Sequence, residues 1–218
     1  MKTRFLTQSL VLAALLLLPA WAGAADLNVT NGAAFEGNFG MQLVFDGDTT
    51  QTFVQDNTPD SEPTYNFEFR LRFNDIVAPD NATQQLMQLR SDVPSNRFRV
   101  FVWCAAGPNV GDCGPAGTGS HYLAFQARRD SGEPGSPYVH CAHVSAGPNG
   151  YVLWRVEFVN GSGSNDGTCR VFRNGTMIVE RFDMPDEVDI DAHRWGALAA
   201  VNPAFIGELH GDNFVSTR

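Results

Sequence analysis

Carboxylates gather in one place in this sequence, the segment Glu187-Val188-Asp189-Ile190-Asp191. Residues two apart on a strand share a face, so these acidic side chains would point the same way. A retaining glycosidase needs an acid and a nucleophile about 5 Å apart across the glycosidic bond. The segment follows Met184-Pro185, however, where a loop is expected, and carboxylates in a solvated loop have no fixed partner to raise a pKa. We therefore expect no catalytic residue there.

Two histidines, His140 and His143, flank Cys141 and offer a general base or a metal ligand. They lie three residues apart, which places them on opposite faces of a strand. The sequence shows no serine or cysteine nucleophile with a local signature. We therefore interpret both histidines as exposed or core-edge residues.

Exposed aromatic rings would suit sugar binding, because a ring stacks on the apolar face of a pyranose. Trp103 stands directly before the glycine-rich segment 104–119, and Tyr138 follows a second turn-rich segment. These two are our candidate ligand-binding residues. The alternative is that the aromatic residues simply fill a core, as we expect for Trp154, which shares one face of its strand with Val152, Val156 and Phe158.

Four cysteines in an exported chain indicate two disulfides, for which three connectivities are open. Cys104 and Cys113 flank a turn-rich loop whose ends can meet, and Cys141 would then join Cys169 on a neighbouring strand. We favour this pairing, although spacing alone does not settle connectivity. Zinc binding is disfavoured because the sequence has no Cys-x-x-Cys pair.

The first 25 residues are predicted to be a secretory signal peptide. Lys2 and Arg4 precede the apolar run Leu10–Leu18, and Ala22-Gly23-Ala24 is a small-residue cleavage site. The apolar run is shorter than the roughly 20 residues of a membrane-spanning helix. We expect a secreted or periplasmic protein that does not span a membrane, with a single domain at residues 26–218.

Acidic residues outnumber basic ones, 24 against 15, and the formal net charge is −9. The predicted signal peptide holds two of the basic residues, so the remaining chain carries 13 basic and 24 acidic residues, or −11. Nucleic-acid binding needs clustered lysine and arginine, so nucleic acid is not expected as a partner. The charge is typical of a soluble protein.

Short alternating runs separated by turn residues dominate the rest of the chain. Tyr65–Phe73 alternates aromatic or aliphatic with polar residues throughout. In 152–158, Val152, Trp154, Val156 and Phe158 fall on one side of an extended chain, and Leu153, Arg155 and Glu157 fall on the other. Asn174-Gly175 separates two β-rich runs and is a strong hairpin signal. About a dozen such runs, with no stretch of helical period, predict an all-β sandwich of two antiparallel sheets.

Several short motifs follow one another in a characteristic order. The residues that carry them are Gly37, Phe39 and Gly40; Asp56, Thr58, Pro59, Glu62 and Tyr65; Trp154; Asn165-Asp166-Gly167; Asn174-Gly175; and Gly196, Gly207 and Asp212-Asn213-Phe214. This order resembles exported bacterial concanavalin-like (laminin-G-like) jelly rolls over nearly the whole predicted mature chain. The segment Cys104–Gly119 departs from the pattern and is interpreted as an insertion.

The resemblance implies a concanavalin-like jelly roll and a family that includes lectins, carbohydrate-binding modules, glycosidases, lyases and adhesion domains. Such folds often hold a structural calcium where the first and last strands meet, which here would involve Glu36 and Asp212. We expect a secreted, non-catalytic binding module for glycan or cell-surface material. A polysaccharide hydrolase or lyase is the first alternative, and a structural or adhesion protein of the cell envelope is the second.

Overall fold

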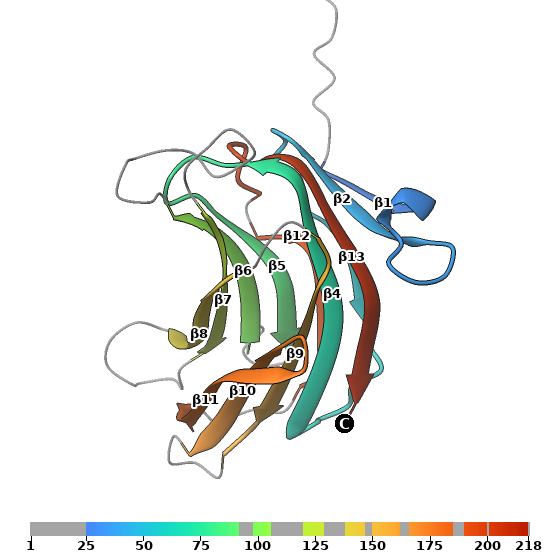
Figure 1. Cartoon of the computed structure of the whole chain (residues 1–218). Coiled ribbons are helices and arrows are strands. Elements are labelled where there is room, and N and C mark those ends of the chain that lie inside the picture. Colours follow the sequence, from blue (N-terminus) through green and yellow to red (C-terminus); the bar gives the residue numbers. More distant parts are fainter. Residues whose placement is uncertain are drawn as a thin grey trace, which may run out of the picture.

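The computed structural model describes residues 25–91, 98–105, 120–128, 138–146, 150–161, 166–184, 190–199 and 201–217. They form a sandwich of two antiparallel β-sheets (Figure 1). The elements in chain order are β1 (Asp26–Thr30), η1 (Asn31–Ala33), β2 (Gly40–Asp46), β3 (Thr52–Asp56), β4 (Thr64–Val77), β5 (Thr83–Arg90), β6 (Phe98–Ala105), β7 (Ser120–Arg128), β8 (Tyr138–Ser145), β9 (Val152–Val159), β10 (Gly167–Arg173), β11 (Thr176–Met184), β12 (Ala192–Leu198) and β13 (Ile206–Thr217).

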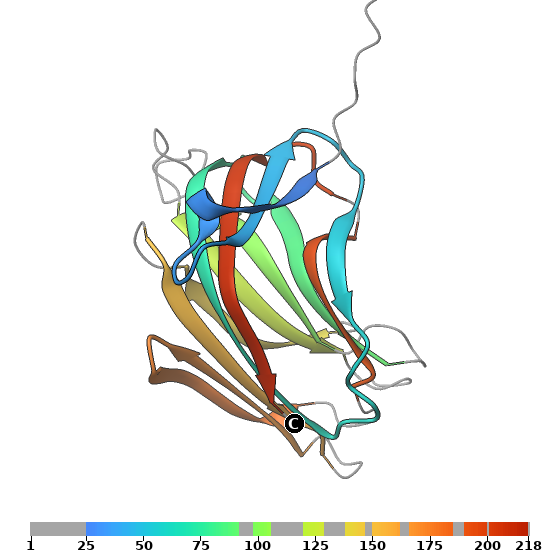
Figure 2. The ribbon, with the colours of Figure 1, turned by 90° about the vertical axis from the view of Figure 1, so that its right-hand side faces the viewer.

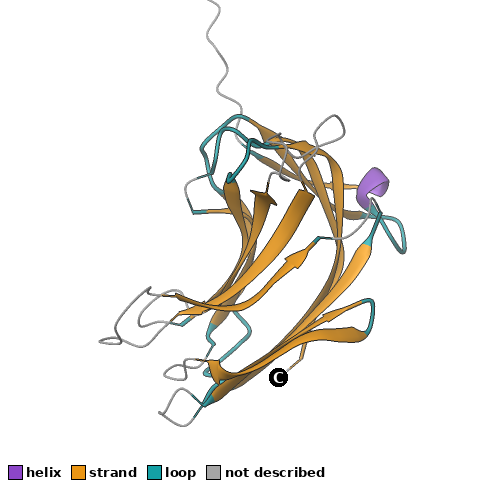
Figure 3. Ribbon diagram, turned by 60° about the vertical axis from the view of Figure 1, so that its left-hand side comes forward, coloured by secondary structure: helices purple, strands orange, loops and turns teal. Residues whose placement is uncertain are grey.

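The two sheets differ in size and in which side they turn outward. The seven-stranded sheet has the order β1-β2-β13-β4-β9-β10-β11, and the six-stranded sheet has the order β3-β12-β5-β6-β7-β8. Both sheets curve in the same sense, so the outer side of the six-stranded sheet is concave (Figures 1 and 3). Figure 2 shows the outer side of the seven-stranded sheet, with β13 running between β2 and β4. The all-β sandwich expected from the sequence is therefore confirmed.

The core lies between the sheets and is built by the alternation seen in the sequence. In β4, Tyr65, Phe67 and Phe69 are buried, whereas the residues between them reach solvent in part. In β9, Trp154 is fully buried and packs 5.8 Å, ring centre to ring centre, from Phe125 of β7 in the opposite sheet. Burying rings on both inner faces removes a large apolar area from water and holds the sheets together.

In β6, every second residue faces this core, which leaves the residues between them on the concave outer side. Phe98, Val100 and Val102 of β6 are buried, and so are Leu123 and Phe125 of β7. The outward side chains of the same strands are therefore held on a packed, rigid sheet.

The hairpin between β10 and β11 turns at Asn174-Gly175, as the sequence predicts. Both residues have positive φ, 50° and 80°, which these two residue types tolerate better than others. The turn brings β11 to the edge of the seven-stranded sheet.

A disulfide joins Cys141 of β8 to Cys169 of β10, with the two Cα atoms 6.0 Å apart. The pairing is the one expected, but the two cysteines do not lie on neighbouring strands. β8 is the edge strand of the six-stranded sheet and β10 belongs to the seven-stranded sheet, so the bond ties the two sheets together. Cys104 is also disulfide-bonded, and its expected partner Cys113 lies outside the described residues.

The predicted signal peptide, apart from Ala25, also lies outside the described residues. Among the residues that are described, no helix is long and apolar enough to cross a membrane.

Candidate functional site

A row of polar side chains crosses the concave face of the six-stranded sheet from edge to edge. Cross-strand partners share a face, so the strand register places one member of the row on each strand. The row, called the polar ladder below, consists of Gln55 (β3), Arg194 (β12), Gln88 (β5), Arg99 (β6), Gln126 (β7) and His140 (β8).

Hydrogen bonds join neighbouring members of the polar ladder at both ends. The Arg194 guanidinium donates to the Gln55 carbonyl oxygen. Arg99 Nε donates to Gln126 Oε1 at 3.1 Å, and Gln126 Nε2 lies 3.1 Å from His140 Nε2. Because an amide NH₂ can only donate, the His140 Nε2 accepts, as it does in the neutral imidazole. The chain from Arg99 through Gln126 to His140 therefore fixes the orientation of all three side chains.

The structure corrects the prediction that His140 and His143 face opposite sides of their strand. The pairing of β7 with β8 is irregular between Phe125 and Gln126. At this irregularity Cys141 and Ala142 are both buried, so both histidines point outward and are exposed. A regular strand would have buried one of them.

Next to the polar ladder lies an aromatic cluster formed by Trp103, Tyr122 and His143. The Trp103 and His143 rings are stacked with their centres 4.3 Å apart, and Tyr122 lies 5.1 Å from His143. Partial burial is the main cause of the lowered pKa of His143, with a smaller contribution from the neighbouring His140. The cluster presents flat apolar surfaces beside polar donors.

The two features meet in an open groove of about 430 Å³. Its described lining comprises Thr83, Arg99, Phe101, Trp103, Ala124, Gln126 and His140. This lining combines aromatic rings, a guanidinium, an amide and an imidazole, and none of these described residues is a carboxylate. Such a surface can stack on a sugar ring and donate hydrogen bonds to its oxygens.

The structure places the side chain of only one of the two expected ligand-binding residues, Trp103 and Tyr138. Trp103 lines the groove, on the strand that also carries Arg99. Tyr138 is the first residue of β8, and its side chain lies outside what the structure describes. Phe101, whose ring lies under the Arg99 guanidinium at 4.7 Å, is a further groove residue.

A second groove of about 410 Å³ lies at the end of the same sheet, and it does contain carboxylates. Asp60 and Asp191 line it together with Arg90. The Asp191 carboxylate accepts a hydrogen bond from the backbone N–H of Ser61 at 3.0 Å and so fastens the adjoining loop. The segment 185–189, which holds the other clustered acidic residues, lies outside the described residues.

Glu36 and Asp212, the expected calcium ligands, lie on the opposite side of the molecule, where they hold a loop. Asp212 Oδ2 accepts hydrogen bonds from the backbone N–H groups of Phe35 and Glu36. The Glu36 carboxylate accepts from the Asn213 side chain at 3.0 Å. Calcium needs six to eight oxygen ligands, and the described residues contain no cluster of three or more His, Cys, Asp or Glu side chains. The contacts seen here therefore suit a fastened loop better than a calcium cage. Calcium stays an untested prediction, which a calcium titration of the melting temperature of wild type and Glu36→Gln would check.

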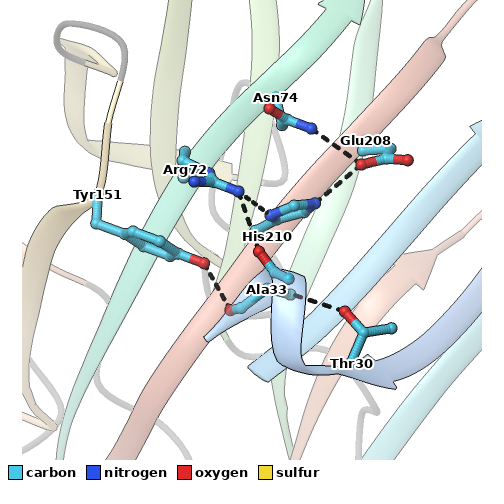
Figure 4. Close-up of polar contacts among 8 residues, drawn as sticks. Thr30, Ala33, Arg72, Asn74, Tyr151, Glu208 and His210 are labelled. Carbon is cyan, nitrogen blue, oxygen red and sulfur yellow. Dashed lines mark hydrogen bonds and ion pairs between the residues drawn. The ribbon is translucent and has the colours of Figure 1, made fainter. Parts of the chain in front are cut away.

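The rest of this loop region is fastened by a polar cluster on the outer side of the seven-stranded sheet (Figure 4). Tyr151 and Arg72 each donate to a backbone carbonyl of η1, at Ala33 and Gly32. Arg72 also contacts the buried His210, whose other ring nitrogen lies 3.0 Å from Glu208. The hydrogen bond with His210 is the main reason why the pKa of Glu208 is lowered. Apart from Arg72 Nε, which is buried without a hydrogen-bond partner, the polar groups named here contact other protein groups, so we assign this cluster a structural role.

No protein-family model matches this chain, and no curated protein matches it. Several solved structures do match the fold of this chain. The endo-β-1,4-glucuronan lyase of the fungus Trichoderma reesei is 12% identical, with 88% of this chain and 86% of that chain covered and a TM-score of 0.61. The cellulose-induced protein Cip1 is 11% identical, with 91% and 88% covered and a TM-score of 0.57. The binding domain of botulinum neurotoxin DC, in complex with SialylT, is 11% identical, with 88% and 41% covered and a TM-score of 0.55.

The fold is a concanavalin-like jelly roll. At these identities the comparisons establish the fold alone, which hosts many unrelated activities. The jelly roll explains why the groove is on the six-stranded sheet, since its curvature makes that outer face the hollow one (Figure 3).

Sequence reasoning missed the polar ladder, although its signal is visible in part. Arg99, Phe101 and Trp103 alternate with buried residues in β6, so their common outward face could be read from the sequence. Their alignment with Gln126 and His140 depends on strand register, which the alternation of a single strand does not give.

Proposed function

We propose that this protein binds a polysaccharide in the groove that Trp103 and Arg99 line on the concave face. The observation that carries the proposal is the composition of this groove: aromatic rings and hydrogen-bond donors on a rigid sheet. Sugar-binding sites need these two elements, since rings stack on the apolar faces of pyranoses and donors fix their hydroxyl or carboxylate oxygens. The solved structures of similar fold include a glucuronan lyase and a toxin binding domain in complex with SialylT, and both are consistent with a glycan ligand for this fold.

Cleavage of a uronate polysaccharide by β-elimination is a second candidate, which the environment of His140 favours. Its Nε2 accepts from Gln126, so the ring is oriented, and its lone pair becomes available as a base when a ligand takes over the Gln126 amide. In an elimination, a base removes the proton next to a uronate carboxyl group, a carbon–carbon double bond forms, and the glycosidic oxygen leaves and takes up a proton. An oriented neutral imidazole beside a guanidinium can supply the base and neutralise the carboxylate.

Hydrolysis is less well supported by the same groove. It requires two carboxyl groups on opposite sides of the scissile bond. The described lining of the groove beside Trp103 has no carboxylate, and the Asp191 carboxylate of the neighbouring groove is used to fasten a loop.

A polysaccharide retention assay, run beside two cleavage assays, tests these alternatives. The wild type should retain at least one polysaccharide, and Trp103→Ala should weaken binding about tenfold, because a lost aromatic contact is worth about 1 kcal/mol or more. Phe182→Ala, which removes an exposed ring from β11 of the other sheet, is the matched control and should bind normally.

The cleavage assays separate the two candidates. Release of ultraviolet-absorbing unsaturated ends, lost in His140→Gln, would support elimination. Release of reducing sugar without such absorbance would support hydrolysis. Silence in all three assays would contradict the proposal and favour the structural or adhesion hypothesis.

A further inference from the structure

All six residues of the polar ladder carry nitrogen-containing polar groups, and a site for neutral sugars does not require this. Its members are three amides, two guanidiniums and one imidazole, and none of the six positions holds a carboxylate or an aliphatic residue. Neutral sugars are bound by mixed donors and acceptors, with carboxylates common among the acceptors. A row made mostly of hydrogen-bond donors instead matches a ligand that is rich in hydrogen-bond acceptors.

The two guanidiniums of the polar ladder place two positive charges on this face, although the chain as a whole has a net charge of −9. Arg90 lies two residues beyond Gln88 on β5, in the second groove, where the carboxylates of Asp60 and Asp191 accompany it, so it is not counted toward the ladder. Burial, and then the like charge of Arg90, lowers the pKa of Arg194. A guanidinium stays protonated despite such shifts, so Arg194 keeps its charge.

The spacing of the guanidiniums suits an extended chain that runs across the strands. Neighbouring strands lie about 4.8 Å apart, so Arg194 and Arg99, with Gln88 between them, are separated by roughly 10 Å. The whole ladder of six strands spans roughly 24 Å. The rings of Phe101 and Trp103 follow Arg99 along β6 and therefore lie to one side of the row. A sugar chain lying along the ladder would then place acidic groups at the guanidiniums and, where it crosses β6, one edge toward the Phe101 ring.

We propose that the polar ladder recognises an extended acidic polysaccharide, with carboxylates bound at Arg194 and Arg99. The planar fork of a guanidinium matches a carboxylate in a bidentate arrangement, and Gln126 and His140, which follow Arg99 in the ladder, contact sugar oxygens beyond it. This inference rests on the proposed function and narrows it, because it names the charge of the ligand and the direction of its chain.

The test compares polymers that differ only in charge. Polyglucuronate, alginate and polygalacturonate are each paired with their carboxyl-reduced form, which keeps the linkage and the length but loses the carboxylates. Binding is measured at two salt concentrations, since salt screens the attraction between exposed charges. We expect at least one acidic polymer to bind at least tenfold more tightly than its reduced form, and to lose that advantage at high salt.

The variants Arg99→Gln and Arg194→Gln locate the effect. Each should weaken binding of the acidic polymer about tenfold or more, because a hydrogen bond to a charged group is lost, and should leave binding of the reduced polymer unchanged. Arg173→Gln, on β10 of the opposite sheet, is the control and should change neither. Circular dichroism and the melting temperature establish that each variant is folded. If a variant does not fold, the salt dependence of wild-type binding still tests whether the ligand is recognised by its charge.

The possible results separate this inference from the proposed function. Equal binding of an acidic polymer and its reduced form would overturn the inference but leave polysaccharide binding intact. A preference for acidic polymers that survives in both variants would overturn the role of the ladder. Binding of no polymer in either form would overturn both proposals.

Discussion

Acid should destabilise this protein through His193, whose ring is buried in the core. Its ring lies 5.3 Å from Phe67 and 4.5 Å from Phe214, centre to centre, and its Nε2 is buried with no hydrogen-bond partner. Burial lowers the pKa of His193 from 6.5 to about 3. The unfolded chain therefore takes up a proton below pH 6.5, whereas the folded protein does so only near pH 3.

The sign and size of the effect follow from proton linkage. Above pH 6.5 neither state binds the proton and His193 has no effect on the pH dependence of stability. Between pH 6.5 and 3, the unfolded state binds more protons, so the free energy of unfolding falls as the pH is lowered. One group contributes about 1.4 kcal/mol per pH unit, which amounts to about 2 kcal/mol at pH 5.

Urea unfolding at about pH 7.5 and about pH 5 measures this contribution. His193→Phe keeps the aromatic packing and removes the titration, so it should lose about 2 kcal/mol less than the wild type between the two pH values. His140→Gln, at an exposed histidine, is the control and should lose as much as the wild type. An equal loss in His193→Phe and the wild type would refute the reasoning.

Three further predictions concern the sandwich itself. Replacing Cys141 and Cys169 by serine opens a link with a sequence separation of 28 and should cost about 3–4 kcal/mol in urea unfolding; an unchanged midpoint would mean that the bond does not constrain the unfolded chain. Phe69→Ala should cost about 3–5 kcal/mol because the ring is buried, and Glu68→Gln should cost little; the reverse order of urea midpoints would contradict the facing of β4. Tyr151→Phe removes the hydrogen bond to η1 and should lower the free energy of unfolding by about 1 kcal/mol, whereas an unaltered melting temperature would show that this contact is dispensable.

The fold could be predicted because its strongest signals are local. The alternation in Tyr65–Phe73 identifies a strand with one buried face, and all of its core positions up to Leu71 are buried. Asn174-Gly175 specifies its own turn through positive φ. The order of short motifs then distinguished a concanavalin-like jelly roll from other sandwiches.

The candidate site could be predicted only in part, because it depends on register and on an irregularity. Trp103 was recognised as an aromatic residue beside a loop, and it lines the groove. His140 and His143 share a face because the pairing of β7 and β8 is irregular, and the periodicity of the sequence does not predict this irregularity. Gln126 and Arg99 become neighbours through pairing across strands, so their roles appear only in three dimensions.

The central claim is that the concave groove is the binding surface, and nuclear magnetic resonance of the protein with a retained polysaccharide tests it most directly. We expect the signals of the Trp103 indole N–H and the Gln126 side-chain amide to shift on binding, because both groups belong to the groove lining. The side-chain amide of Asn74, which bonds Glu208 on the opposite face, should stay unchanged. Shifts at Asn74 with none at Trp103 and Gln126 would contradict the account.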